Sequence, residues 1–279
     1  MDVPATLDEI EAAHALREWL SPLRRVFVLT GAGISTASGI PDYREEAGGW
    51  KRQPPVTYQA FTGDEATRRR YWARSFAGWP RFDAAAPNAA HAALAAWQGT
   101  GRVSMLLTQN VDGLHERAGS RGVVDLHGRL DTVVCLACGE RTPRALLQAR
   151  LADANRGWVD TVAAFAPDGD ADIQRTDFSG YVVPDCLRCG GMLKPDVVFF
   201  GENVPRERVQ AAHDALLASD GLLVVGSSLM VYSGFRFARM AHEAGLPIAS
   251  VTLGATRADD LIALALRADC SRVLPIAMA

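Results

Sequence analysis

The sequence lacks the features that would place it in a membrane, in a secretory pathway or on nucleic acid. No apolar run approaches the ~20 residues that a membrane-spanning helix needs. The N-terminal stretch MDVPATLDEIEAAHALREWL has neither the basic start of a secretory signal nor the acid-poor character of a transit peptide. The net charge is −3, from 29 basic and 32 acidic residues, which disfavours a non-specific nucleic-acid binder. We therefore expect a cytoplasmic protein that binds neither membranes nor nucleic acid.

Cysteine is scarce, and its placement argues against a disulfide scaffold. The chain has five cysteines in 279 residues, and a reducing compartment would keep them as thiols. Four of them form two Cys-x2-Cys pairs, Cys135 with Cys138 and Cys186 with Cys189, while Cys270 stands alone. Two such pairs suit tetrahedral coordination of one structural Zn²⁺ ion. Four buried, reduced cysteines are the less favoured alternative.

Short apolar runs alternate with helical patterns along most of the chain. Helices are expected over residues 8–20, 207–218 and 234–244. Strands are expected in RRVFVLT, VSMLLT, VVDLHG, VVFFGE, GLLVVGSS and PIASVTLG. Uniformly apolar strands between amphipathic helices indicate an α/β fold, a doubly wound, Rossmann-like parallel sheet. Ligands of such a sheet bind beyond the carboxyl ends of its strands.

Two segments interrupt this alternation. Residues 50–97 are helical in character, and residues 131–194 contain the paired cysteines around a polar interior. We interpret them as a helical insertion and a zinc-binding module that form a smaller lobe. The Rossmann-like domain would then consist of residues 1–49, 98–130 and 195–279.

The stretch VFVLTGAGISTASGIPDYR joins the first expected strand to a glycine-rich loop. Gly31 and Gly33 let backbone N–H groups approach a pyrophosphate, and a following helix would add partial positive charge. The third glycine, Gly39, falls later than in the usual dinucleotide fingerprint. No strand ends in an acidic ribose ligand roughly 20 residues on. The loop therefore predicts a phosphate cradle unlike that of a common dehydrogenase, and a plain glycine turn is the alternative.

Polar side chains follow two further strands. Asn110 and Asp112 alternate in extended chain and can enter one pocket, where they suit a carboxamide and ribose hydroxyls. A turn-forming Asn-x-Asp is the alternative. His127 ends another strand and can act as a general base near neutral pH, although strand-end histidines are commonly structural. We expect structural roles for His91 and His115.

In combination, these motifs resemble those of the sirtuins, which are NAD⁺-dependent protein lysine deacylases. GAGISTASGIPDYR, TQNVDGLH, LHG, the two cysteine pairs, KPDVVFFGE and VVGSSLMVYSG occur in the sirtuin order over nearly the whole chain. The segments PDYR, RYWARSFAGWP, APDGD and VYSG are most similar to class II, the sirtuin-four-like branch. The resemblance implies cleavage of the bond between nicotinamide and ribose rather than hydride transfer, within an NAD-binding Rossmann-like domain.

The resemblance also implies a mechanism in which both nucleophiles come from the substrates. The acyl-lysine oxygen attacks ribose C1′ as nicotinamide leaves, and His127 accepts a proton from a ribose hydroxyl. The 2′-oxygen then attacks the imidate, and water releases the amine and O-acyl-ADP-ribose. The implied catalytic residues are His127, Asn110 and Asp112. Protein mono-ADP-ribosyl transfer from the same NAD site is the closest alternative, followed by an NAD or ADP-ribose binding module without turnover and a nucleic-acid-binding zinc protein.

The resemblance further implies which residues contact the ligands. NAD would be held by Gly31, Ala32, Gly33, Ser35, Asp42, Tyr43, Arg44, Gln109, Asn110, Val111, Asp112, Gly226, Ser227, Ser228, Thr252, Leu253, Gly254 and Cys270. Many sirtuins have asparagine where Thr252 stands. An acylated lysine of a protein substrate would enter as an added strand, in contact with Val197, Phe199, Gly201, Glu202 and Val231.

The acyl group itself would meet Tyr71 and Arg74, which one helical turn places on one face. Arg74 would pair with the terminal carboxylate of an acidic acyl group, and a solvated arginine is the alternative. A monomeric chain is expected.

Overall fold

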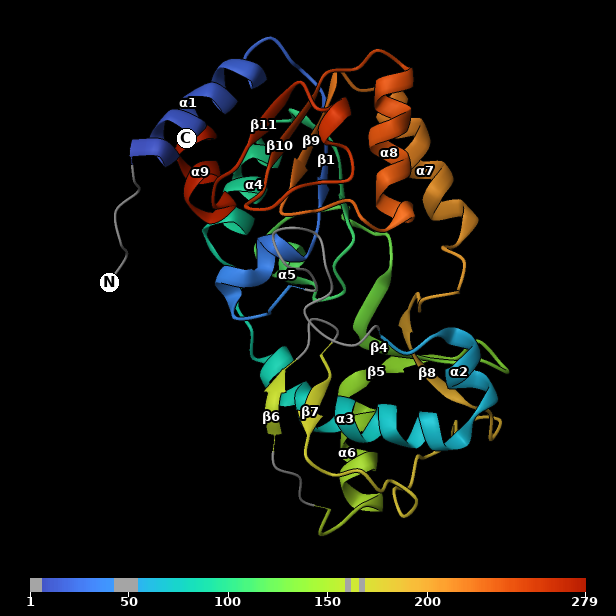
Figure 1. Cartoon of the computed structure of the whole chain (residues 1–279). Coiled ribbons are helices and arrows are strands. Elements are labelled where there is room, and N and C mark those ends of the chain that lie inside the picture. The colour runs from blue at the N-terminus through green and yellow to red at the C-terminus, as the bar shows by residue number, and fades with distance from the viewer. Residues whose placement is uncertain (1–6, 43–54, 159–161, 166–168) are drawn as a thin grey trace.

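Six parallel strands form the larger sheet, at the upper end of the molecule in Figure 1. The computed structural model describes residues 7–42, 55–158, 162–165 and 169–279. The strand order is β11-β10-β9-β1-β2-β3. The bounds are β1 (Val26–Thr30), β2 (Val103–Thr108), β3 (Val124–Asp125), β9 (Gly221–Val225), β10 (Ile248–Val251) and β11 (Leu264–Leu266). Thr30 pairs in register with both Thr108 and Val225, so the carboxyl ends of the three central strands lie side by side.

Helices cover both faces of this sheet, which explains why every residue of β1 is buried. On one face lie α1 (Leu7–Leu20), α4 (Ala89–Gly99) and α9 (Cys270–Ala277), whose apolar side chains join one core cluster. On the other face lie α7 (Arg206–Leu217) and α8 (Tyr232–Glu243), which share a second cluster. The prediction of a Rossmann-like α/β sheet is confirmed.

A smaller lobe hangs below the sheet in Figure 1. Its antiparallel sheet has the order β5-β4-β8. The lobe contains α2 (Tyr58–Gly63), α3 (Glu65–Asp83), β4 (Gly128–Cys135), β5 (Arg141–Pro143), α6 (Arg144–Ala154), the hairpin strands β6 (Val162–Phe165) and β7 (Ala171–Ile173), and β8 (Leu193–Val197). The short α5 (Leu114–Arg117) lies between the sheet and the lobe. A third cluster, rich in aromatic side chains, fills the lobe.

Two expected elements differ from the structure. The segment VVFFGE is not a strand beyond Val197, because side chains bind its backbone groups. The Glu202 carboxylate accepts the Phe199 N–H at 2.9 Å, and the Lys194 ammonium donates to the Val197 carbonyl. After the glycine loop the chain forms a 3₁₀ helix (Ala32–Ser38) instead of an α-helix, and Gly39 ends it with a φ of 83°.

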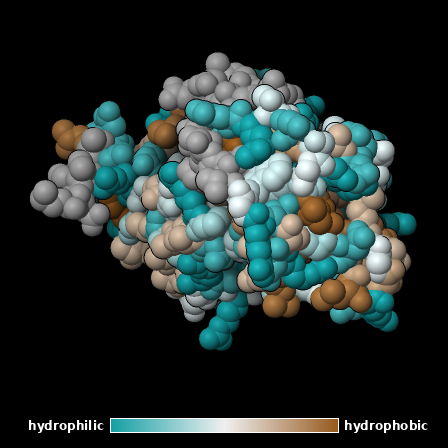
Figure 2. All heavy atoms as spheres, turned by 90° about the horizontal axis from the view of Figure 1, so that it is seen from below, coloured by the Kyte–Doolittle hydropathy of each residue, from teal (hydrophilic) through white to brown (hydrophobic). Residues whose placement is uncertain are grey.

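The molecular surface offers few large apolar areas on the side that Figure 2 shows. In this view, from the end of the small lobe, hydrophobic residues are scattered among hydrophilic ones. Among the helices in the described ranges, none has both the length and the apolar character needed to cross a membrane.

Candidate active site

A cavity of about 490 Å³ lies between the sheet and the smaller lobe. Its walls come from the loops that follow β1, β2 and β9, as expected for the carboxyl edge of a parallel sheet. The predicted ligand contacts that line it are Gly31, Ala32, Gly33, Ser35, Asp42, Tyr71, Gln109, Asn110, Val111, Asp112, His127, Val197, Phe199, Gly201, Glu202, Gly226, Ser227, Ser228, Val231, Thr252, Leu253, Gly254 and Cys270. Tyr43 and Arg44 lie outside the described residues. Arg74 is not among the lining residues.

The glycines of two loops let the backbones after β1 and β9 pack directly on each other. The Gly33 N–H donates to the Gly226 carbonyl at 2.8 Å. Gly226 has a φ of 58°, and a Cβ there would lie 2.3 Å from the Ile34 nitrogen. A side chain at Gly226 would therefore force the loops apart and fill the floor of the cavity.

Three polar side chains meet above this floor. Ser35 Oγ donates to Asp112 Oδ2 at 2.7 Å, and Asn110 Nδ2 donates to Ser35 Oγ at 3.0 Å. Asp112 Oδ1 accepts the Leu114 N–H at 2.9 Å, at the start of α5. Ser35 itself is 1% exposed. The network fixes an amide and a carboxylate side by side, although residues 109 and 111–112 form bends instead of the extended chain that the sequence predicted.

His127 is held by both ring nitrogens. Its Nδ1 lies 2.9 Å from the Gln109 carbonyl oxygen, and its Nε2 lies 2.7 Å from Ser233 Oγ. Because a carbonyl oxygen only accepts, Nδ1 carries the hydrogen of the neutral ring and Nε2 keeps its lone pair. Burial lowers the pKa of His127 to about 4, and the positive field of Arg208 acts in the same direction. The ring is therefore a neutral proton acceptor at physiological pH.

The two other histidines of the region are buried and do not line the cavity. His91 Nδ1 accepts the Asn88 N–H at 3.3 Å in the capping box of α4. His115 Nε2 lies 2.9 Å from Thr30 Oγ1. Burial lowers the pKa of His91 to about 4 and that of His115 to about 3.

These depressed values predict an acid-sensitive fold. The unfolded chain protonates a histidine near pH 6.5, whereas the folded chain keeps His91, His115 and His127 neutral down to about pH 4. Their contribution to stability is thus complete above pH 6.5 and is lost as the pH falls toward 4. Asp125 acts oppositely in this window, because burial raises its pKa to about 7. We expect a net uptake of about two protons on unfolding. The free energy of unfolding should therefore fall by about 2.7 kcal/mol for each pH unit of acidification.

Urea titrations at several pH values between 7.5 and 4.5 measure the slope of the free energy of unfolding against pH. The variant His91→Gln isolates one proton of it, because glutamine at the third position of α4 can still complete the capping box. We expect its slope to be smaller by about 1.4 kcal/mol per pH unit. Equal slopes for the native chain and the variant would contradict a neutral, buried His91.

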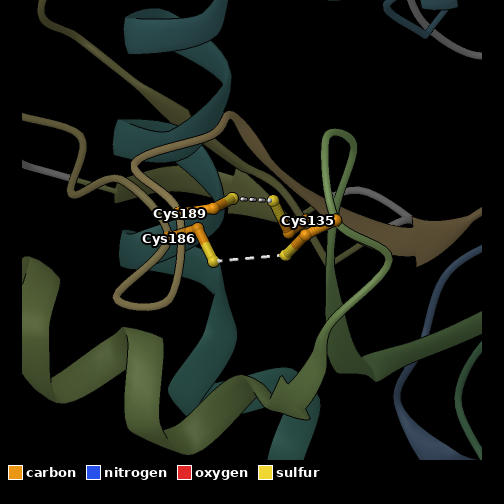
Figure 3. A group of neighbouring side chains, drawn as sticks. Cys135, Cys186 and Cys189 are labelled. Atoms are coloured by element: carbon orange, nitrogen blue, oxygen red, sulfur yellow. Dashed lines mark hydrogen bonds between the residues drawn. The ribbon is translucent and has the colours of Figure 1, made fainter.

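The four paired cysteines converge in the smaller lobe (Figure 3). Their sulfur atoms all lie within 4.8 Å of one another, with Cys135 to Cys189 at 3.5 Å and Cys138 to Cys186 at 3.9 Å. A tetrahedron with Zn–S bonds of about 2.3 Å has edges of about 3.8 Å. Backbone N–H groups lower the pKa of Cys135 to about 6, and the neighbouring thiols raise that of Cys189 to about 12. The donor set fits one zinc ion, whose charge would hold all four as thiolates.

The structure corrects the expected placement of Arg74. Its guanidinium donates to Asp172 Oδ1 at 2.6 Å and to the Ala171 carbonyl at 3.0 Å, and it lies 3.8 Å from Asp170. The side chain is thus bound to β7 and its preceding residue rather than facing the cavity. Tyr71, one turn earlier, does line the cavity and packs edge-on against Phe61.

The sequence reasoning missed several lining residues. The most informative are Tyr232, Ser233 and Arg236, which come from the first turns of α8. Ser233 is part of the VYSG segment, but no local pattern indicates its contact with a histidine 106 residues away. Leu229, also at the wall, has a left-handed backbone with a φ of 53°. A non-glycine residue in that region commonly marks a functional loop.

Comparisons with known proteins agree on one family. Residues 31–233 match the Sir2 family. The chain is 60% identical over 264 residues to an NAD-dependent protein deacetylase of Xanthomonas campestris pv. campestris, covering 95% of this chain and 90% of the relative. It is 57% identical to NAD-dependent protein deacetylase 2 of Bradyrhizobium diazoefficiens, covering 94% and 96%.

Two solved structures show the same fold. One is Sir2 with a p53 peptide and NAD⁺, with a TM-score of 0.75, 28% identity and coverage of 92% of this chain and 93% of that chain. Another is a Sir2 variant with a deacetylated p53 peptide and 3′-O-acetyl-ADP-ribose, with a TM-score of 0.76, 28% identity and coverage of 95% and 96%.

Proposed function

We infer the function from one premise: the chain belongs to the Sir2 family. It is an NAD-dependent protein deacylase, which transfers the acyl group of an acyl-lysine to ADP-ribose and releases nicotinamide. It acts on a protein substrate, uses NAD, and has four cysteines positioned for one structural zinc ion. The roles of individual residues, the acyl preference and the binding mode of the peptide are our proposals.

We propose that His127 is the general base. The observation that carries this role is its geometry: Nδ1 is occupied by a carbonyl, Nε2 has the lone pair, and the ring is neutral inside the cavity. It would accept the proton of a ribose hydroxyl, so that the ribose oxygen can attack the acyl-derived carbon. General bases contribute typically 10²–10⁴-fold to a rate.

We propose that Asn110 and Asp112 position the nicotinamide ribose for this transfer. Ser35 Oγ donates to the Asp112 carboxylate and accepts from the Asn110 amide, which fixes both groups in the cavity wall. A preformed arrangement of this kind lowers the barrier because little reorganisation remains at the moment of reaction. The backbone after Gly31 and Gly226 would carry the diphosphate, and residues 252–254 with Cys270 would lie against the adenosine. Tyr43 and Arg44 belong to the same proposal from the sequence alone.

We propose that the substrate peptide lies across the irregular segments 198–203 and 229–231, which both line the cavity. Neither segment belongs to one of the described sheets, and the peptide would pair with backbone groups there that Glu202 and Tyr58 do not already bind. The acyl-lysine would pass between Val197, Phe199 and Val231. We also propose that the chain is a monomer. Size-exclusion chromatography with light scattering would test this oligomeric state.

We propose that this cavity is the cleft between two domains. The predicted division assigns residues 1–49, 98–130 and 195–279 to one domain and residues 50–97 and 131–194 to the other, but α4 packs in the core cluster beside the large sheet, so the helical insertion ends before Ala89. Two of the three core clusters flank the large sheet, and the third fills the smaller lobe.

Deacylation is tested directly by mass spectrometry of one lysine peptide with acetyl, glutaryl, lipoyl or long fatty acyl groups. We expect acyl loss that requires NAD, together with one O-acyl-ADP-ribose per amine. Attachment of ADP-ribose to the peptide or to the enzyme itself, without loss of the acyl group, would instead support mono-ADP-ribosyl transfer.

The acyl preference follows from the position of Arg74. Since its guanidinium is bound to Asp172, and Ile40, Leu130 and Phe199 line the wall, we expect apolar acyl groups to be removed faster than glutaryl. The variant Arg74→Ala should leave the ratio of glutaryl to acetyl turnover within about twofold, and Arg70→Ala on the exposed side of α3 is the matched control. A selective loss of glutaryl turnover in Arg74→Ala would show that the arginine leaves Asp172 for the substrate.

A further inference from the structure

The base has a partner to which no motif assigns a role. Ser233 Oγ lies 2.7 Å from His127 Nε2, and Ser233 lines the cavity. The opposite ring nitrogen donates to the Gln109 carbonyl at 2.9 Å. The imidazole is therefore held at both ends, once by the loop after β2 and once by the first turn of α8.

The direction of these hydrogen bonds follows from the donor inventory. With Nδ1–H bound to a carbonyl, Nε2 is an acceptor in the neutral ring, so the Ser233 hydroxyl donates to it. Once Nε2 gains a proton it becomes a donor. The hydroxyl can then rotate and accept, because it has both a hydrogen and lone pairs. Ser233 is suited to both protonation states of His127.

Ser233 is fixed in place by close packing around it. The next residue, Gly234, lies against the Gln109 side chain, and a Cβ there would come within 2.4 Å of Gln109 Nε2. Gln109 Oε1 accepts from Ser227 Oγ at 2.6 Å. The residue whose carbonyl orients one end of the imidazole thus also packs on the helix that presents Ser233 to the other end.

We propose that Ser233 is a positioning residue of the deacylation reaction: its hydroxyl holds the His127 ring through Nε2, turns aside when a ribose hydroxyl takes that single lone pair, and accepts from the imidazolium afterwards. This inference rests on the proposed role of His127. In the step that it serves, a ribose O–H bond breaks and an N–H bond forms on Nε2. The electron pair left on oxygen forms the new bond to the acyl-derived carbon. Ser233 exchanges no atom with the substrates.

The charged groups around His127 are the same in the native chain and in a Ser233 variant, so the hydrogen bond at Nε2 sets the direction of the pH effect. The charged groups on the elements that meet there are Arg208 of α7, Asp125 of β3, Arg129 of β4, Arg236 of α8 and Asp112 after β2. Arg129 is paired with Glu116 at 2.8 Å and Asp131 at 2.5 Å, whereas Asp125, whose pKa is raised to about 7, is uncharged in the acidic range. The hydrogen bond that the Ser233 hydroxyl accepts from the imidazolium is charge-assisted and stronger than the one that it donates to the neutral ring, so removal of Ser233 lowers the pKa of His127.

The kinetic test compares the native enzyme with Ser233→Ala, Ser233→Thr and His127→Ala. Alanine has a higher helix propensity than serine, so α8 should keep its first turn. For Ser233→Ala we expect kcat to fall about tenfold with the KM for NAD nearly unchanged, and the acid limb of kcat/KM to move to lower pH. Ser233→Thr, which keeps the hydroxyl, should restore both kcat and the native position of the acid limb. An unmoved acid limb, or a threonine variant no better than alanine, would overturn the inference.

A second measurement separates this inference from the proposed function. The pKa of His127 can be read from ¹⁵N-labelled histidine by NMR in the absence of substrates, with the signal assigned through His127→Ala. We expect the pKa to fall in Ser233→Ala, and an unchanged value overturns the hydrogen bond. Native protein that removes no acyl group would overturn the proposed function, while the titration still decides the role of Ser233.

Discussion

His127→Ala is expected to lose deacylation by about 10²–10⁴-fold, the range of a general base, while nicotinamide exchange persists. In the mechanism that we propose, the first step, cleavage of the nicotinamide–ribose bond, uses the acyl oxygen of the substrate as nucleophile. The base would be needed only when the ribose hydroxyl attacks. The variant also leaves the Gln109 carbonyl and the Ser233 hydroxyl without their ring partner, which should lower stability modestly.

The measurement is parallel kinetics of peptide deacylation and of exchange between NAD and labelled nicotinamide. His213→Ala is the matched control, because it removes a half-buried histidine of α7 that lies 3.1 Å from Asp214 Oδ1 and does not line the cavity. We expect the control to equal the native chain in both assays. If His127→Ala deacylated at the native rate, another group would be the base, and the geometry of Nε2 would have no catalytic meaning.

The sequence predicted the parts of this fold that depend on local composition. The strand Val26–Thr30 is recognisable because burial on both faces allows only apolar or small residues. Its end marks the carboxyl edge of the sheet, so Gly31 and Asn110 could be brought to one site without knowledge of the strand order. The cysteine pairs were predicted to converge because their spacing suits one metal ion, and their sulfur atoms do lie together.

The features that the sequence did not predict depend on contacts between distant residues. Arg74 binds Asp172, 98 positions away, and no periodicity distinguishes that partner from solvent or substrate. The segment after Val197 has a strand composition, yet the Glu202 side chain bonds its backbone and prevents the pairing. The tautomer of His127 depends on a carbonyl and a hydroxyl that three-dimensional packing selects.

Removal of the zinc-binding thiols is expected to abolish deacylation by loosening the strands that form one wall of the cavity. Strand β4 begins directly after His127 and ends at Cys135, about 25 Å away at the usual rise of a strand. Its partner β8 starts four residues after Cys189 and ends at the cavity wall with Val197. Metal ligation at one end of this pair therefore constrains His127 and Val197 at the other.

The size of the effect follows from the energy of the site. Structural zinc contributes on the order of 10 kcal/mol or more to folding in small domains, which exceeds the stability of a typical lobe. Cys135 and Cys186 also belong to the core cluster that contains Tyr181 and Leu147. Without the ion, four thiols would remain in contact with no charge to hold them together. We expect the smaller lobe to lose its packing while much of the large sheet persists.

The test is the double variant Cys186→Ser with Cys189→Ser, with zinc measured by mass spectrometry and lobe order by hydrogen exchange. We expect about one zinc ion per native chain, none in the variant, fast exchange in β4 and β8, and at least about a 100-fold loss of deacylation. Cys270→Ser controls for the loss of a thiol and should retain the zinc ion, because Cys270 lies in α9, outside the cysteine cluster. A zinc-free variant that kept native activity would show that β4 and β8 hold the cavity wall without the metal.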